Sequence, residues 1–182
     1  MRPLLKLATI GACTLAVSPL AAEAEPSAGP ALVVLVRHAE PTGTSGDPGL
    51  SEAGRKRAEA LVSALRFSNI SAIFTSTLRR TRDTAQPVAG ALAVAAVAVD
   101  GGSPDQHIAA LAAAVRNARG AVLVVGHRDT VPKVIGALDG PQLDTLCDVH
   151  GRMYLLSAAG GKVHLVRAQF GAAESDPGPN CP

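Results

Sequence analysis

Residues 32–40 read LVVLVRHAE, a run of branched apolar residues that ends abruptly in charged and imidazole side chains. Such a run predicts a strand buried on both faces of a sheet. Arg37, His38 and Glu40 then fall at its C-terminal end, the edge at which open α/β sheets bind ligands. An arginine can fork onto phosphoryl oxygens, and a histidine can act as base, ligand or nucleophile. From this stretch alone, the alternative is a polar cap on a core strand with a satisfied histidine.

Two further predicted strands end in polar side chains. The strand at residues 72–75 is followed by Ser76, with Arg80 at the start of the next helix. The apolar run at residues 121–125 is followed by His127. Because the carboxyl ends of parallel strands share one edge of a sheet, two arginines and two histidines are expected to converge there. These four side chains are suited to a pocket that binds a dianionic phosphoryl group.

The elements between these strands predict the fold class. Strands are expected from residue 32 and at residues 72–75, 92–99, 121–125, 153–157 and 163–168, with a helix after each of the first four. The last two strands read as a hairpin. The sequence therefore predicts a three-layer α/β/α sandwich with a mostly parallel sheet and one antiparallel strand at its edge. In the helices, the basic run at residues 55–57 is interpreted as a solvated side, and Pro87 as a kink or early stop.

Residues 1–24 have the features of a signal peptide. A charged start, an apolar run at residues 7–22 and the small-x-small pattern AEA at residues 22–24 place cleavage after residue 24. The run is too short and interrupted for a lasting membrane span, so we expect no membrane span in the mature form and a periplasmic or secreted location. Lipid anchoring through Cys13 is the alternative, although it leaves fewer apolar residues than the ~7–15 of an h-region.

One domain is predicted at residues 31–170, between a linker at 25–30 and a tail at 171–182. Loss of the signal peptide lowers the formal charge from +2 to +1, and only 2% of residues are aromatic, which argues against a nucleic-acid partner. We expect a small phosphorylated substrate or phosphate instead, and the oligomeric state is left open. Cys147 and Cys181 could pair in an oxidising compartment, with two free thiols as the alternative.

Four motifs resemble the histidine phosphatase superfamily, which has the phosphoglycerate-mutase-like fold. RHAE at residues 37–40 is similar to its Arg-His-Gly-Glu signature, with Ala in place of Gly. LSEAG at residues 50–54 and STLRR at residues 76–80 match its Leu-[Ser/Thr]-x-x-Gly and Ser-x-Leu-x-Arg segments, and residues 126–127 resemble its second histidine. The resemblance covers roughly residues 31–170.

The resemblance implies that His38 is a nucleophile that takes the phosphoryl group and is then hydrolysed. Arg37, Arg80 and His127 would be catalytic with it and would hold the phosphoryl oxygens. Phosphoryl transfer needs mainly positioning and charge neutralisation, which these residue types supply without a metal or other cofactor. Glu40 is interpreted as shaping the site through hydrogen bonds.

One residue is a candidate for the general acid. Many relatives carry Glu or Asp after the third strand to protonate the leaving oxygen, and here that region reads DGGSPD at residues 100–105. Asp105 is the best candidate, but Ser103 and Pro104 fit a helix start, where an acid is favoured by the helix dipole. Asp105 is therefore left outside the predicted catalytic set. Arg79, beside the site arginine, is expected to be outward or structural.

The main hypothesis is a metal-independent phosphatase that acts on a phosphomonoester or phosphohistidine. The alternatives are a non-catalytic phosphate-binding or signalling module and a phosphoglycerate-mutase-type phosphotransferase. A metal-binding protein is the weakest hypothesis, because His107, His150 and His164 have no ligand partner at zinc spacing in the sequence.

Overall fold

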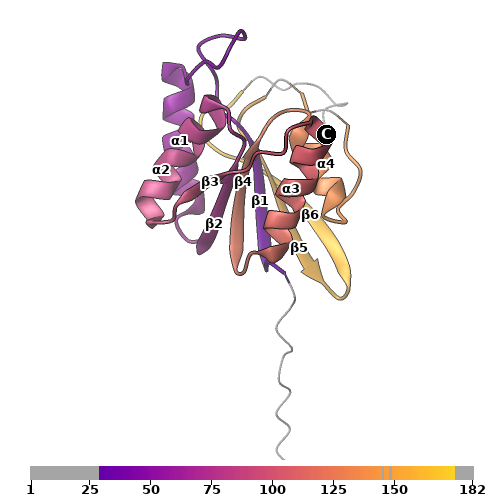
Figure 1. Cartoon of the computed structure of the whole chain (residues 1–182). Coiled ribbons are helices and arrows are strands. Elements are labelled where there is room, and N and C mark those ends of the chain that lie inside the picture. The colour runs from indigo at the N-terminus through magenta and orange to yellow at the C-terminus, as the bar shows by residue number, and fades with distance from the viewer. Residues whose placement is uncertain (1–28, 145, 148, 175–182) are drawn as a thin grey trace, which may run out of the picture.

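The computed structural model describes residues 29–144, 146–147 and 149–174. Within this part, strands and helices alternate until a final hairpin (Figure 1). The elements are β1 (Leu32–Arg37), α1 (Glu52–Leu65), β2 (Ile70–Thr75), α2 (Arg79–Leu92), β3 (Ala96–Ala98), α3 (Pro104–Asn117), β4 (Ala121–Gly126), α4 (Thr130–Ala137), β5 (Arg152–Ala159) and β6 (Lys162–Gln169). The signal peptide, Cys13, Cys181 and most of the linker and tail lie outside the described residues, so those interpretations remain predictions.

The six strands form one sheet in the order β3-β2-β4-β1-β5-β6. β1, β2, β3 and β4 pair in parallel, whereas β5 pairs antiparallel with both β1 and β6. This mixed sheet between helices confirms the predicted fold class. The prediction of an antiparallel strand at the edge of the sheet is wrong in one respect. The antiparallel strand is β5, and β6 pairs on its outer side, so β5 does not lie at the edge.

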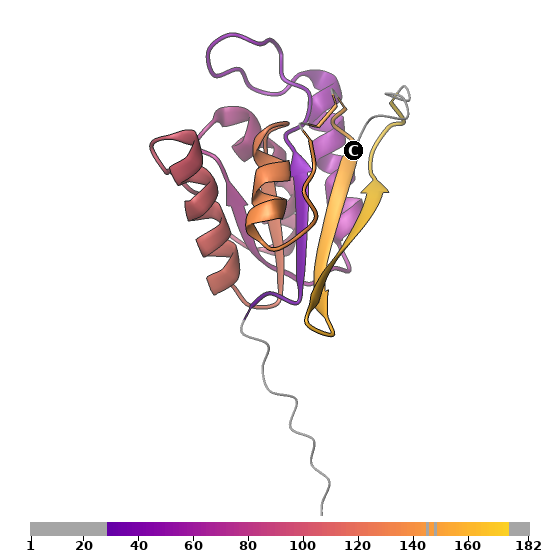
Figure 2. The ribbon, with the colours of Figure 1, turned by 90° about the vertical axis from the view of Figure 1, so that its right-hand side faces the viewer.

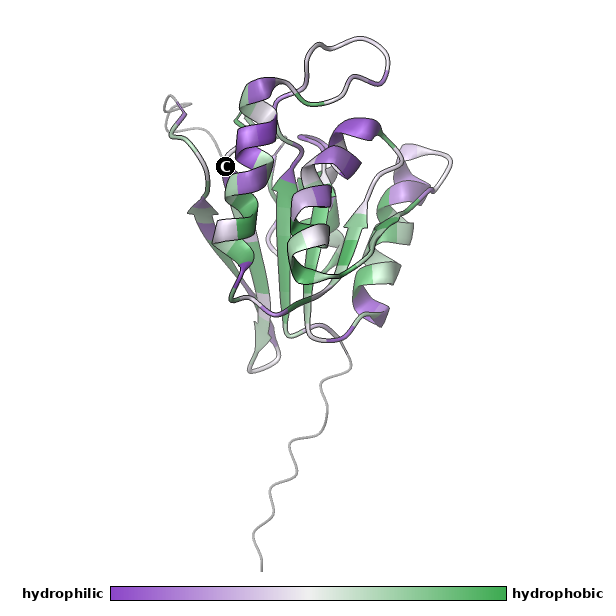
Figure 3. Cartoon of the chain, turned by 90° about the vertical axis from the view of Figure 1, so that its left-hand side faces the viewer, coloured by the Kyte–Doolittle hydropathy of each residue, from purple (hydrophilic) through white to green (hydrophobic). Residues whose placement is uncertain are grey.

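Helices cover both faces of the sheet, which gives three layers (Figure 1). The alternation of side chains along β1 explains how one strand serves both cores. Val33 and Leu35 pack with residues of α3 and α4, whereas Val34 and Val36 pack with residues of α1 and α2. Hydrophobic residues line the sheet and hydrophilic residues gather on the outer helix faces (Figure 3).

Local capping fixes where two of the helices begin. The hydroxyl of Ser51 accepts a hydrogen bond from the Gly54 N–H at the start of α1. Gly54 is required there, because a Cβ atom would overlap the carbonyl oxygen of Glu40. At the start of α3, Ser103 and Gln106 form a reciprocal capping box, as the helix-start pattern predicted.

Two predicted boundaries differ from the structure. Pro87 lies inside α2 and does not shorten it, because Ala85 and Val88 on either side are fully buried and hold the helix against the sheet. α2 therefore continues to Leu92, the residue at which the third strand was expected to begin. Only Ala96–Ala98 of that segment pair as a strand, and all three are exposed at the edge of the sheet.

The C-terminal hairpin turns at Gly160 and Gly161. Both glycines have positive φ, 59° and 74°, which suits the tight two-residue turns that join twisted strands. Figure 2 shows the hairpin beside α4, with α3 and α4 over the same face of the sheet. Among the described residues, no helix is both long and apolar enough to cross a membrane.

Candidate active site

The ends of three adjacent parallel strands bring the predicted site residues together. β1 and β2 both flank β4, and Arg37 at the end of β1 pairs with Gly126 at the end of β4. His38 directly follows β1 and His127 directly follows β4, so both residues lie at the same edge of the sheet. Their rings meet edge to face with centroids 5.3 Å apart. The sheet thus brings the histidines of two distant motifs into contact.

A cavity of about 760 Å³ opens at this edge. Its walls include segments near residues 41–44, 100–104 and 127–130. All four predicted site residues line it: Arg37, His38, Arg80 and His127. The structure therefore places the predicted set around one cavity.

His38 is held in one tautomer by the backbone. Its Nδ1 lies 2.8 Å from the carbonyl oxygen of Ala39, and because a carbonyl only accepts, Nδ1 carries the proton. The pKa of His38 is lowered to about 3, chiefly by burial; the hydrogen bond with Ala39 opposes this, and His127, Arg37 and Arg80 add to the lowering. At neutral pH the ring is uncharged, so Nε2 has a lone pair available for reaction.

His127 is also kept neutral. Burial is the largest cause that lowers its pKa to about 4, followed by the positive charge of Arg80. Its Nε2 lies 2.9 Å from the hydroxyl oxygen of Ser76, which in turn contacts the hydroxyl of Thr81. Ser76, the polar residue that follows β2, therefore orients the second histidine.

Arg79 and Arg80, the first two residues of α2, have different surroundings. Arg80 lines the cavity, and its carbonyl oxygen accepts a hydrogen bond of 2.7 Å from the hydroxyl of Thr84. The side chain of Arg79 is 62% exposed and forms an ion pair with Asp83. The interpretation of Arg79 as outward is confirmed.

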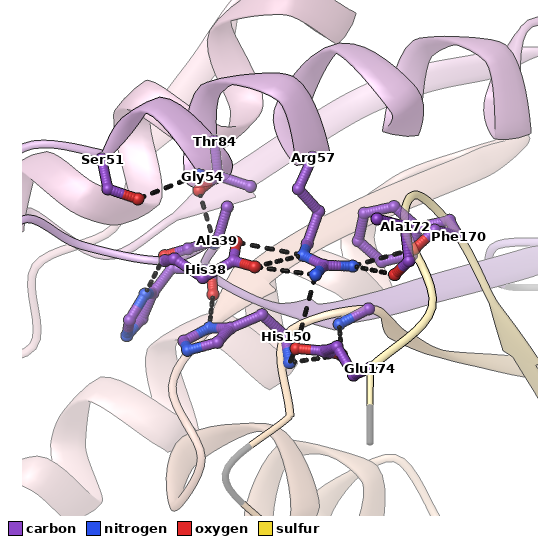
Figure 4. Close-up of polar contacts among 12 residues, drawn as sticks. His38, Ala39, Ser51, Gly54, Arg57, Thr84, His150, Phe170, Ala172 and Glu174 are labelled. Carbon is purple, nitrogen blue, oxygen red and sulfur yellow. Dashed lines mark hydrogen bonds and ion pairs between the residues drawn. The ribbon is translucent and has the colours of Figure 1, made fainter. Parts of the chain in front are cut away.

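Arg57 overturns the interpretation of residues 55–57 as a wholly solvated side. Its side chain is only 5% exposed and turns inward from α1 to the carboxylate of Glu40, with Nη2 2.7 Å from Oε1. Its Nη1 donates to the carbonyl oxygens of Phe170 and Ala172 (Figure 4). A cation can be buried here because an acid from the β1 loop and the chain after β6 supply its partners. Glu40 thus shapes the site through hydrogen bonds.

His150 is a buried residue beside the site that the sequence reasoning did not select. Its Nδ1 lies 2.7 Å from the carbonyl oxygen of His38, and the two rings are 5.5 Å apart between centroids. Burial lowers its pKa, as it does for the other two histidines. Sequence patterns describe neighbours within a helix or strand, so they give no indication that His150 contacts His38, which is 112 positions away.

Asp105 and Asp100 have different positions relative to the cavity. Asp105 is an exposed first-turn residue of α3 and is not among the cavity-lining residues, whereas Asp100 lines the cavity. The Oδ1 atom of Asp100 accepts a hydrogen bond from the Gly102 N–H. The omission of Asp105 from the catalytic set agrees with this placement, and Asp100 is a cavity acid that sequence reasoning did not single out.

The histidines do not form a metal centre within the described chain. No group of three or more His, Cys, Asp or Glu side chains lies at metal-binding geometry among residues 29–144, 146–147 and 149–174. Cys147 is disulfide-bonded, and its partner lies outside these residues. Its pairing with Cys181 therefore stays a prediction.

Comparison with known proteins agrees with this fold. Residues 33–101 match the family model of the histidine phosphatase superfamily, branch 1. That match contains Arg37, His38 and Arg80 but ends before His127. No curated protein matches the sequence. Over residues 33–101 the chain is therefore similar to the histidine phosphatase superfamily.

Three solved structures illustrate the likeness. YhfR of Bacillus stearothermophilus has 19% identity and a TM-score of 0.58, with 74% of this chain and 94% of that chain covered. SixA of Agrobacterium tumefaciens, assigned as a phosphohistidine phosphatase, has 24% identity and a TM-score of 0.56, with 79% and 99% covered. A mycobacterial glucosyl-3-phosphoglycerate phosphatase with inorganic phosphate has 18% identity and a TM-score of 0.57, with 78% and 97% covered. At these identities the likeness shows a shared fold.

Proposed function

We propose that this protein is a phosphatase that uses His38 as a covalent nucleophile. The observation that carries the proposal is the state of the His38 ring. Its Nδ1 proton is held by the carbonyl of Ala39 and its pKa is lowered to about 3, so the other ring nitrogen is unprotonated at neutral pH. Because the ring also lines the cavity, a phosphoryl group bound there can meet a neutral imidazole.

The reaction takes place in two displacements at phosphorus. Nε2 of His38 attacks, the Nε2–P bond forms, and the bond from phosphorus to the leaving oxygen or nitrogen breaks with its electron pair on the leaving group. The leaving group takes up a proton from solvent or from an acid that lines the cavity. In the second step water attacks phosphorus, the Nε2–P bond breaks, and the water proton passes to solvent as inorganic phosphate forms.

Three side chains are proposed to hold the phosphoryl oxygens: Arg37, Arg80 and His127. The guanidinium groups neutralise the charge that spreads over these oxygens in the transition state. Neutral His127 contributes a hydrogen bond instead of a further positive charge. No step requires a metal, because positioning and charge neutralisation come from the chain itself.

Two substrate classes fit the proposal, phosphomonoesters and phosphohistidine. The family match and the names of the structural relatives support a phosphatase of one of these kinds. Hydrolysis is favoured over mutase-type transfer by the cavity walls. In the described chain these walls are loops and helix starts, with no additional element to retain an intermediate while a product reorients. Export to the periplasm or outside the cell remains a proposal that rests on residues 1–24.

The experiment measures turnover of p-nitrophenyl phosphate by the purified protein, with and without EDTA. His38→Asn should lower kcat by at least about 10³-fold, because it removes the nucleophile. His164→Asn is the matched control, since that histidine is exposed on β6. Rapid quenching of the wild type should trap an acid-labile phosphate on His38.

Other results would contradict the proposal in distinct ways. Phosphate binding without turnover by the wild type would identify a binding module. Activity retained by His38→Asn would exclude the covalent mechanism. A loss of activity in EDTA that a divalent cation restores would contradict the metal-free reaction.

A further inference from the structure

The peptide group between His38 and Ala39 is held from both sides. Its carbonyl oxygen, which belongs to His38, accepts a hydrogen bond of 2.7 Å from Nδ1 of His150 (Figure 4). Its N–H group, which belongs to Ala39, donates to the hydroxyl oxygen of Thr84 at 2.9 Å. One partner comes from the segment before β5 and the other from α2, so two separate parts of the fold fix one peptide plane.

This peptide plane controls how the His38 ring is presented. Its rotation sets the backbone angles on either side, ψ of His38 and φ of Ala39. These angles decide whether Nδ1 of His38 can reach the Ala39 carbonyl, a contact that is 2.8 Å in the structure. A freely rotating peptide would loosen this contact and with it the tautomer in which Nε2 has the lone pair.

His150 is itself held in place by the chain after β6. The carboxylate of Glu174 accepts hydrogen bonds from the N–H groups of His150 and Gly151, at 2.8 Å and 2.7 Å. Glu174 also forms an ion pair with Arg57, whose Nη2 is 3.4 Å from Oε1. Arg57 additionally binds Glu40, close to the nucleophile. The backbone of His150 is thus fixed, and its ring nitrogen Nδ1 is directed at the carbonyl oxygen of His38.

We propose that His150 is a positioning residue of the phosphoryl-transfer site, which acts by fixing the His38–Ala39 peptide and so the tautomer and direction of the His38 ring. Its Nδ1 must carry the proton, because its partner is a carbonyl oxygen. Its ring is not among the residues that line the cavity, so it acts through the backbone of His38 and not on the substrate. This inference rests on the proposed function of His38.

Two amide variants test the position of the donor. His150→Asn places an amide N–H where Nδ1 lies, whereas His150→Gln places it near Nε2. His150→Asn should keep kcat within about threefold of the wild type, whereas His150→Gln and His150→Leu should lower kcat by about 10- to 100-fold with little change in KM, as expected for a misaimed nucleophile. His164→Leu, at an exposed position, is the control for loss of a histidine.

A second measurement does not depend on turnover. The ¹⁵N shifts of the His38 ring should show protonated Nδ1 in the wild type and in His150→Asn, and a mixture of tautomers in His150→Gln. If His150→Leu does not fold, the comparison of His150→Asn with His150→Gln still tests the positioning role. Equal kcat and equal tautomer populations in that pair would overturn the positioning role. Absence of turnover in the wild type would instead refute the proposed function, and the ring shifts would still test the positioning.

Discussion

Arg57 and Glu40 form a two-pronged ion pair, in which the guanidinium Nε and Nη2 atoms lie 2.9 Å and 2.7 Å from the carboxylate Oε1. Burial raises the pKa of Glu40, but the hydrogen bond and charge of Arg57 outweigh it, and the pKa lies below its ordinary value. Because Glu40 is two residues after His38, the pair joins α1 to the loop that carries the proposed nucleophile.

Arg57→Met should therefore destabilise the protein by about 3 kcal/mol, because it leaves the carboxylates of Glu40 and Glu174 without their shared cation. Lys56→Met is the matched control. Lys56 forms an exposed i,i+4 ion pair with Glu52, which is worth at most about 0.5 kcal/mol. Urea unfolding of both variants measures the difference. Equal midpoints would mean that the buried pair contributes no more than the exposed one.

The fold and the site differ in how much of them the sequence predicts. The order of elements along the chain, the fold class and the convergence of Arg37, His38 and His127 follow from local patterns, because apolar runs mark the strands and parallel pairing aligns their ends. The inward turn of Arg57 does not follow. Its neighbours Arg55 and Lys56 are exposed, and the partners that make its burial possible come from distant segments.

The boundaries and roles that were missed share a physical cause. The segment at residues 92–99 is rich in alanine, which favours a helix over a strand, and α2 extends to Leu92. His150 is recognised only when the carbonyl of His38 is placed beside it. Asp100 precedes two glycines in a loop, and no periodic pattern indicates that such a residue faces a cavity.

The neutral histidines predict a loss of stability in acid. The pKa of His127 is lowered to about 4 in the folded protein, below the ordinary value of 6.5. The unfolded chain therefore binds a proton first as the pH falls, so this contribution is full above about 6.5 and decreases as the pH approaches 4. His38 contributes with the same sign, since its pKa is lowered to about 3.

His127→Gln isolates one of these contributions. Between pH 7 and pH 5, the free energy of unfolding should fall by up to about 2 kcal/mol less in this variant than in the wild type. Urea unfolding at the two pH values gives the comparison. A variant that loses as much stability as the wild type would show that His127 is not buried in its neutral form.

The disulfide of Cys147 is predicted to join it to Cys181. Peptide mapping of the non-reduced mature protein should link the two peptides. The bridge would close a loop of about 34 residues, and its reduction should lower the free energy of unfolding by roughly 3–4 kcal/mol in the chain-entropy model. Cys181→Ser should show the same loss without reductant. A free Cys181 thiol in the non-reduced mature protein would contradict the pairing.

Asp100 and Asp105 provide the sharpest test of the leaving-group chemistry. A phenolate of low pKa departs without a proton, whereas an alkoxide needs a donor in the transition state, which is usually worth about 10²–10⁴-fold. Asp105 is an exposed first-turn residue of α3, and Asp100 lines the cavity. Asp105→Asn should therefore slow alkyl and aryl phosphates by the same small factor, reflecting only the helix start.

Asp100→Asn should slow an alkyl phosphate at least about 10-fold more than an aryl phosphate if the cavity acid donates the proton. The measurement is the ratio of the two losses in kcat/KM for each variant. A ratio near one for Asp100→Asn would point to leaving groups that need no acid, phosphohistidine or acidic phosphate esters among them. A large ratio for Asp105→Asn would mean instead that the first turn of α3 approaches the substrate during the reaction.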